Sequence, residues 1–135
     1  MPNGYVHRTA GAVMGSITYL AIKNDCQKKE PVDLGELILS TGVGLSTARI
    51  PDILEPPINP NHRAFYHSLA FGFLIGFVGT QAWKDFQLKS GEKRIQGIRQ
   101  WSFREYVDVA VILTCVSILL HLVMDGFTKK GLNII

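Results

Sequence analysis

The side chains best suited to chemistry in this sequence are imidazoles and carboxylates that occur in a few short stretches. Seven of them are candidates for a shared site: His7, Asp52, Glu55, His62, His67, His121 and Asp125. Imidazole and carboxylate groups are the ligands that zinc takes in proteins, and iron and manganese accept the same set. One tetrahedral ion takes four ligands, so this set is sufficient for one or two divalent ions.

The spacing within two of these stretches places donors side by side. His121 and Asp125 are four residues apart, so on a helix both project from one face. His62 and His67 are five apart, which suits a loop ligand followed by one from the first turn of a helix. Each residue also has a purely structural interpretation, since a single histidine on an apolar helix is more often packed than ligating. No gapped signature such as His-Glu-x-x-His is present.

Two arginines, Arg8 and Arg63, directly follow candidate histidines. A guanidinium group binds phosphate or carboxylate bidentately, so beside a metal either arginine could hold an anionic substrate. Ordinary ion pairing with Asp52 or Glu55 would explain both arginines equally well.

The apolar residues form four blocks without formal charge, at 9–22, 37–48, 64–83 and 109–124. Blocks of this kind indicate helices, and these helices would position the candidate residues. A bilayer-spanning helix needs about 20 mostly apolar residues, which the third block provides and the fourth provides once 106–107 are added. A soluble four-helix bundle should have charged helix faces, and the third block has none. The sequence therefore predicts an all-α fold, a small membrane-embedded bundle of about four helices.

A proline-rich connection at 49–63 joins the second and third blocks. Its four prolines exclude a regular helix throughout and predict that Asp52 lies in a rigid, non-helical stretch. The connection at 84–105 is charged, and the one at 23–33 is polar.

Composition limits the function classes further. A length of 135 residues predicts a single domain over 1–135, and 47% hydrophobic against 19% charged residues excludes a disordered chain. Two cysteines, Cys26 and Cys115, are too few for a disulfide scaffold. A net charge of +3 indicates no direct nucleic-acid binding. The expected partners are the lipid bilayer and a small-molecule or lipid substrate, and a homo-oligomer is compatible with this.

Four antiparallel spans would place all seven candidates at one end of the bundle. The connections at 23–33 and 84–105 carry nine lysines and arginines, and the opposite side carries five. This bias predicts that the nine-residue side is cytoplasmic and that the candidate site is on the non-cytoplasmic side. A nine-to-five split also leaves the reverse orientation open.

Three strings connect the sequence with a known family: PDILEPP from Pro51, HRAFYHS from His62 and HLVMDGFTKKG from His121. They resemble the YdjM-like family of LexA-binding, inner-membrane-associated, metal-dependent hydrolases. The family pattern is an early histidine, Pro-Asp, His-Arg-Gly-x-x-His-Ser, and His-x-x-x-Asp with a Thr-x-x-Gly tail. It falls here on His7, Pro51, Asp52, His62, Arg63, His67, Ser68, His121, Asp125, Thr128 and Gly131. Ala64 replaces the glycine, and Leu54 stands where many members have a second aspartate, which puts a second metal in doubt unless Glu55 substitutes.

The resemblance implies a membrane-bound, metal-dependent hydrolase of a bacterial inner (cytoplasmic) membrane. Zinc is the first expectation for the ion, with manganese or iron as alternatives, and the substrate would be a phosphoester or a lipid. Glu55 would serve as general base and Arg63 would stabilise developing charge. The proposed ligands are His7, Asp52, His62, His67, His121 and Asp125.

The alternative is a non-catalytic membrane module. A structural metal would then hold helix ends together, and the basic loop would bind a partner or anionic lipid. The surplus groups Glu55 and Arg63 favour the hydrolase, because a structural site does not need them. An ion transporter is less favoured, since its ionisable groups should lie near the bilayer midplane.

Overall fold

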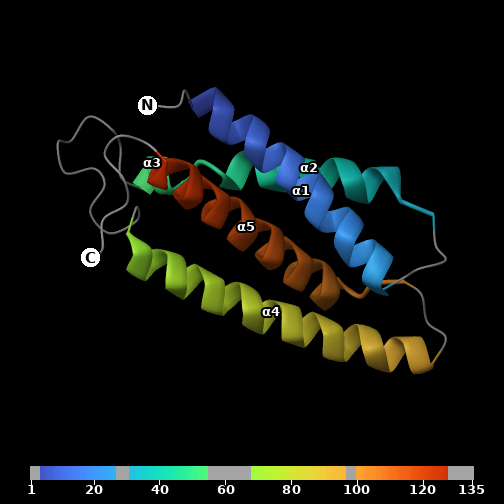
Figure 1. The fold of residues 1–135 in the computed structure, drawn as a ribbon. Coiled ribbons are helices and arrows are strands. Elements are labelled where there is room, and N and C mark those ends of the chain that lie inside the picture. Colours follow the sequence, from blue (N-terminus) through green and yellow to red (C-terminus); the bar gives the residue numbers. More distant parts are fainter. Residues whose placement is uncertain (1–3, 27–30, 55–67, 97–99, 128–135) are drawn as a thin grey trace.

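A computed structural model describes residues 4–26, 31–54, 68–96 and 100–127, and the regular elements in these ranges are helices (Figure 1). The prediction of an all-α bundle of about four helices is confirmed. In these ranges the structure has four longer helices, α1 (Gly4–Cys26), α2 (Leu34–Thr47), α4 (Leu69–Ile95) and α5 (Phe103–Gly126). A short helix, α3 (Ile50–Leu54), follows α2.

Polar caps fix where three of these helices begin. Asp33 Oδ1 accepts the backbone N–H of Glu36 at 3.0 Å at the start of α2, and Ser68 Oγ accepts that of Phe71 at 3.1 Å before α4. Ser102 and Glu105 form a reciprocal capping box at the start of α5. Each cap satisfies an N–H that the first helical turn leaves without a partner.

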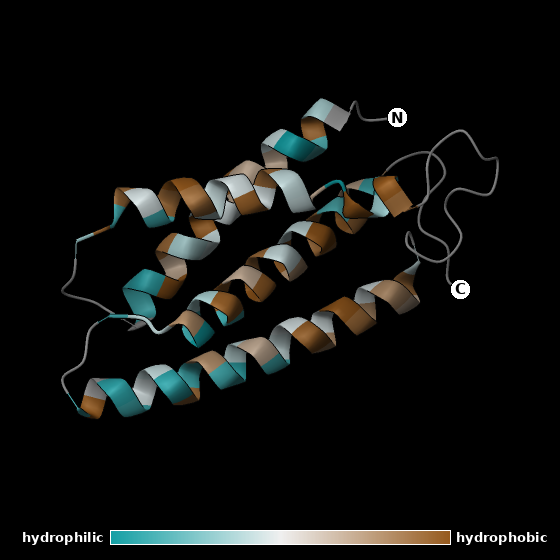
Figure 2. Cartoon of the chain, turned by 180° about the vertical axis from the view of Figure 1, so that it is seen from behind, coloured by the Kyte–Doolittle hydropathy of each residue, from teal (hydrophilic) through white to brown (hydrophobic). Residues whose placement is uncertain are grey.

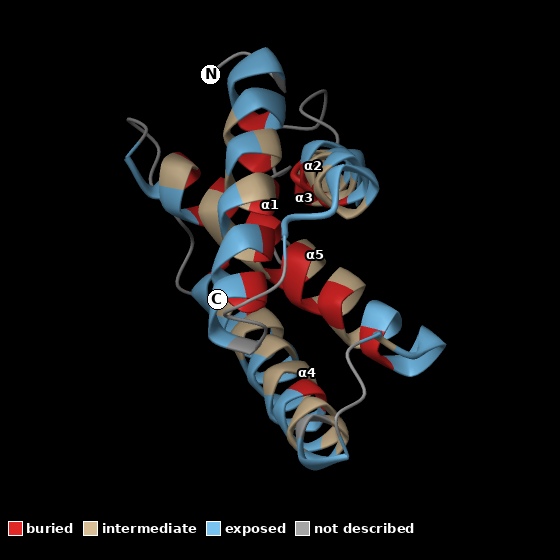
Figure 3. Cartoon of the chain, turned by 90° about the vertical axis from the view of Figure 1, so that its right-hand side faces the viewer, coloured by how far each residue is buried: buried red, intermediate tan, exposed pale blue. Residues whose placement is uncertain are grey.

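The central element is α5, which lies between α4 and the α1–α2 pair (Figure 1). One core cluster joins Val109, Ile112 and Leu113 of α5 to Phe86 of α4 and Ile22 of α1. A second cluster, nearer the C-terminal end of α5, is formed by Phe71, Ile118 and Leu122. The buried surface is concentrated on the inward faces of the helices, above all on α5 (Figure 3).

Glycines allow α1 and α2 to cross in close contact. A Cβ atom on Gly11 would overlap the carbonyl oxygen of Gly44, and one on Gly44 would overlap that of Gly11. A Cβ on Gly15 would likewise overlap the carbonyl oxygen of Ser40. Small residues permit this approach of two backbones, as is common for helix pairs in lipid.

The helix α4 is longer than its uncharged block predicts. The segment 84–95, expected to belong to a charged connection, continues the helix to Ile95. Phe86 is fully buried, Lys89 Nζ pairs with Asp108 Oδ2 of α5 at 2.6 Å, and Lys93 pairs with Glu105. These contacts to α5 hold the charged half of α4 in helical form, which gives the bundle a hydrophilic end (Figure 2).

The expectation of a non-helical environment for Asp52 is wrong, because this residue belongs to α3. Pro51 is the second residue of that short helix, where no backbone N–H is required for an intrahelical bond. A break at Ala48–Arg49 separates α3 from α2.

Of the helices in the described ranges, α5 alone is long and apolar enough to cross a membrane by length and composition. The 14 residues of α2 would extend about 21 Å, against about 30 Å of hydrocarbon. The four-span arrangement therefore stays a prediction. Large apolar side chains nevertheless face outward, among them Phe73 and Phe77 of α4 and Leu39 of α2.

Candidate functional site

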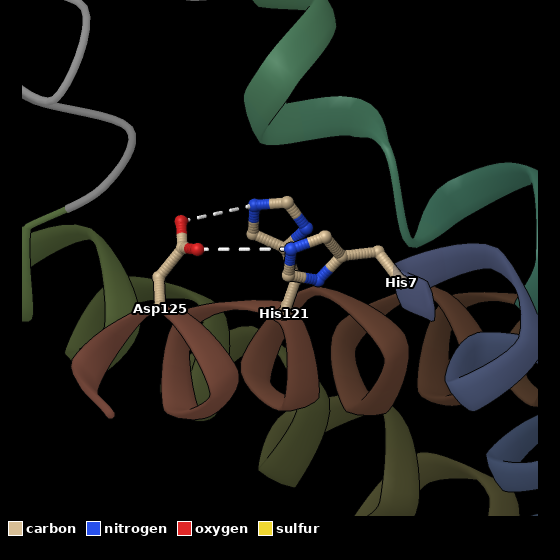
Figure 4. Close-up of side chains that lie close together, drawn as sticks. All are labelled: His7, His121 and Asp125. Carbon is tan, nitrogen blue, oxygen red and sulfur yellow. Dashed lines mark ion pairs between the residues drawn. The ribbon is translucent and has the colours of Figure 1, made fainter. Parts of the chain in front are cut away.

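Two of the predicted donors project from the last turns of α5. His121 and Asp125 are both buried, and His121 Nε2 lies 3.4 Å from Asp125 Oδ2 (Figure 4). This is the geometry that their four-residue spacing predicts for one helix face.

A third donor comes from the opposite end of the sequence. His7, near the start of α1, is also buried, and its Nε2 lies 3.7 Å from Asp125 Oδ1. The imidazoles of His7 and His121 have centroids 4.1 Å apart and planes inclined at 31° (Figure 4). The carboxylate of Asp125 thus faces two imidazoles, one from each helix.

Asp52 brings a second carboxylate to the same place from α3. Its Oδ1 lies 3.5 Å from His121 Nε2, and its side chain is 26% exposed. We call these four residues, His7, Asp52, His121 and Asp125, the His–Asp cluster. Three of its members are buried, and Asp52 provides its accessible side.

The distances within the His–Asp cluster resemble those between ligands of one metal ion. At 3.4, 3.5 and 3.7 Å the N···O separations exceed the usual hydrogen-bond range of about 2.7–3.2 Å. Ligands at 2.0–2.1 Å from a tetrahedral zinc ion lie about 3.4 Å from one another. Ligand atoms of His7, His121 and Asp125 all fall within 4.8 Å of one another, a grouping that could hold a metal ion.

The charges of the His–Asp cluster fit a divalent cation as well. Two carboxylates accompany two imidazoles, and neutral imidazole with carboxylate is the donor set of zinc, iron and manganese. A divalent ion would add positive charge beside the buried carboxylate of Asp125 and the partly exposed carboxylate of Asp52.

Four of the predicted site residues lie outside the described residues: Glu55, His62, Arg63 and His67. Their predicted roles stay predictions. On one side of this segment Asp52 of α3 belongs to the cluster, and on the other Phe71, in the first turn of α4, packs against Ile118 and Leu122 of α5.

Two further residues near the His–Asp cluster were not among the sequence candidates. Ser117 is fully buried one turn before His121 on α5, and its Oγ has no hydrogen-bond partner. Arg49 stands three residues before Asp52, with a buried Nε that also has no partner. The four-residue spacing of Ser117, His121 and Asp125 is a sequence signal for the serine, whereas nothing in the local pattern indicates Arg49.

A different polar network occupies the opposite end of the bundle. Glu36 accepts hydrogen bonds from Tyr19 at 2.7 Å, Tyr106 at 2.7 Å and Lys23 at 3.1 Å. Burial alone would raise the pKa of Glu36, but these three donors outweigh burial and lower the pKa. A mostly apolar cavity of about 240 Å³ between α2 and α5 touches Glu36 and Trp101 and includes no residue of the His–Asp cluster.

Comparison with known families extends the resemblance of the sequence strings to the whole chain. Residues 1–135 match the family described as YdjM inner membrane protein. No curated protein and no solved structure matches the chain. The family match agrees with the apolar helix α5 and supports a location in the inner membrane. Because the match covers every residue, the chain belongs to the YdjM inner membrane protein family.

Proposed function

We propose that this protein is a membrane-bound, metal-dependent hydrolase whose centre is the His–Asp cluster. One observation carries the proposal: two imidazoles and a carboxylate from α1 and α5 converge in a buried place with ligand-like separations. Membership of an inner membrane family supplies the setting for the activity.

The proposed ligands are the His–Asp cluster together with His62 and His67, holding one or two ions of zinc, manganese or iron. A bound divalent ion of this class acidifies water and polarises substrate oxygens. The chain's own residues have the remaining tasks. Glu55 is proposed to accept the proton of the attacking water, and Arg63 to stabilise negative charge that develops on a phosphoester or lipid substrate.

Partial exposure of Asp52 supports a catalytic rather than a purely structural centre. A structural site closes all its positions with protein ligands, whereas a catalytic site keeps one open. The trio of His7, His121 and Asp125 is 1–3% exposed, but the Asp52 side chain is 26% exposed. Substrate and water would enter on this side. From the distribution of lysine and arginine, we place the site on the non-cytoplasmic side of the membrane.

The metal content of two matched variants tests the proposal. Asp125→Asn removes a carboxylate ligand of the His–Asp cluster, and Asp108→Asn makes the same change on α5, in a residue paired with Lys89. We expect the purified wild-type protein and Asp108→Asn to retain zinc, and Asp125→Asn to lose affinity by at least about tenfold. Equal zinc content in all three proteins would contradict the proposal.

Removal of the metal provides a second test, of activity. Chelation should abolish hydrolysis of a chromogenic phosphodiester such as bis(p-nitrophenyl) phosphate, and added zinc or manganese should restore it. A protein that binds metal at the cluster but hydrolyses neither phosphoesters nor lipid esters would instead be the non-catalytic module.

A further inference from the structure

Arg49 is distinguished by the lack of a partner for its charge. Its Nε is buried and has no hydrogen-bond acceptor, and it forms no ion pair with a carboxylate of the described ranges. The other basic side chains that are not exposed there behave differently. Lys23 pairs with Glu36, Lys89 with Asp108 and Lys93 with Glu105.

An unpaired guanidinium in a membrane protein requires an explanation. The Arg49 side chain is half-buried, and its Nε is the buried donor atom that has no acceptor. A buried donor without an acceptor is costly. Arginine cannot avoid the cost by losing its proton, because its guanidinium stays charged in proteins. An anion from outside the described residues would supply the missing acceptor.

Local geometry associates Arg49 with the His–Asp cluster. The carbonyl oxygen of Arg49 accepts the backbone N–H of Ile53 at 3.0 Å, so Arg49 begins the helical turn that carries Asp52. Residues three apart on a helix are neighbours on its surface. Asp52 Oδ1 in turn lies 3.5 Å from His121 Nε2, which places the turn of Arg49 beside the cluster.

We propose that Arg49 binds the phosphate group of the substrate at the edge of the His–Asp cluster. This inference rests on the proposed hydrolase and names its substrate class as a phosphate ester. Guanidinium binds two oxygens of a phosphate in parallel hydrogen bonds. A phosphate has further oxygens for a metal ion, whereas a carboxylate would use both of its oxygens on Arg49. The phosphate could belong to a lipid headgroup or to a soluble ester.

The test measures phosphate binding and metal content in the same samples. The full chain is purified in detergent, loaded with zinc and freed of excess metal. It is then titrated calorimetrically with inorganic phosphate and with dihexanoyl phosphatidic acid. The variants are Arg49→Gln, which removes the charge, and Arg49→Lys, which keeps the charge but loses the bidentate geometry. Arg104→Gln is the control, since Arg104 is exposed near the start of α5, at the other end of the bundle.

We expect Arg49→Gln to weaken binding of both probes about 10- to 100-fold. Arg49→Lys should have an intermediate effect, and Arg104→Gln should match the wild type, with zinc content unchanged throughout. Tighter binding of dihexanoyl phosphatidic acid than of inorganic phosphate would indicate a lipid source, and similar affinities would indicate a soluble one.

Two results would overturn the role of Arg49. One is equal phosphate affinity in Arg49→Gln and the zinc-loaded wild type, and the other is loss of zinc in Arg49→Gln, which would make the arginine a structural support of the cluster. Absence of zinc from the wild type is a separate outcome and would overturn the proposed hydrolase itself.

Discussion

Among the individual residues, Glu36 shows how the end of the bundle opposite the His–Asp cluster keeps a carboxylate ionised. It precedes the uncharged segment 37–48 and accepts hydrogen bonds from Tyr19, Lys23 and Tyr106, so it links α1, α2 and α5. Its pKa is lowered, because these donors outweigh the effect of burial. Replacement by glutamine should leave the buried Lys23 without its counter-charge.

We therefore expect Glu36→Gln to lower the free energy of unfolding at neutral pH by about 1–3 kcal/mol. A group with a lowered pKa stabilises the fold above its unfolded pKa of about 4.3, and this contribution is lost as pH falls through the lower folded value. Thermal unfolding in detergent between pH 7 and pH 3 should show a steeper decline below about pH 4 for the wild type than for Glu36→Gln. Glu92→Gln, at an exposed position on α4, is the control and should leave the pH profile unchanged.

The residues of the candidate site differ in how far sequence could predict them. His121 and Asp125 share a helix, so their spacing alone placed them together. His7 and Asp52 could be assigned only to the same end of a bundle, because their approach depends on how α1 and α3 pack against α5. Arg49 could not be predicted as a site residue, since the absence of a partner for its charge is visible only in three dimensions.

At the scale of elements, α1 and α2 can cross closely because glycines, which have no side chain, stand where the two backbones meet. Gly44 faces the backbone of Gly11, so an added methyl group would force the two helices apart. Gly42, two residues earlier on the same helix, has open space around the position of a Cβ atom. The two glycines form a matched pair for mutation.

Gly44→Ala should lower the free energy of unfolding by about 1–3 kcal/mol through overpacking. Gly42→Ala should be neutral or stabilising by up to about 1 kcal/mol, because alanine favours a helix over glycine. Thermal unfolding of both variants in detergent is the measurement. Similar destabilisation by the two substitutions would show that the crossing is not as close as described.

The extents of the helices were less predictable than their number. Uncharged blocks predicted four long helices, but the charges after residue 83 suggested that the third had ended. Those charges are compatible with a helix because Asp108 and Glu105 of α5 pair with Lys89 and Lys93. The partners are distant in the sequence, so the pattern of α4 alone could not predict them.

At the scale of the whole molecule, large apolar side chains are exposed on the outer surface of α2 and α4. Phe73 is 79% exposed and Phe77 62% exposed on α4, while Leu39 of α2 is 71% exposed. Side chains of this size on the outside of a water-soluble protein would form an aggregation-prone surface. We expect these side chains to face acyl chains in the inner membrane.

Cysteine labelling in membranes tests this arrangement. In a background with both native cysteines replaced by alanine, Phe73→Cys should resist a charged maleimide, because its thiol lies in hydrocarbon. Arg104→Cys, exposed at the hydrophilic end, should react readily once the membrane is permeabilised. Rapid modification of Phe73→Cys in intact bilayers would contradict the assignment of this face to lipid.

The position of the Lys93–Glu105 pair on α5 also indicates how deep the His–Asp cluster lies in the bilayer. Glu105 and Asp125 are buried carboxylates on one continuous helix, 20 residues apart, which corresponds to about 30 Å of rise. That is about the thickness of the bilayer hydrocarbon. If the Lys93–Glu105 pair lies at one membrane–water interface, the length of α5 places the His–Asp cluster at the opposite interface, at the level of the lipid headgroups. Bilayer thickness would then regulate the proposed hydrolysis, because a thicker membrane would draw the cluster below the layer in which water and the proposed phosphate-ester substrate are found.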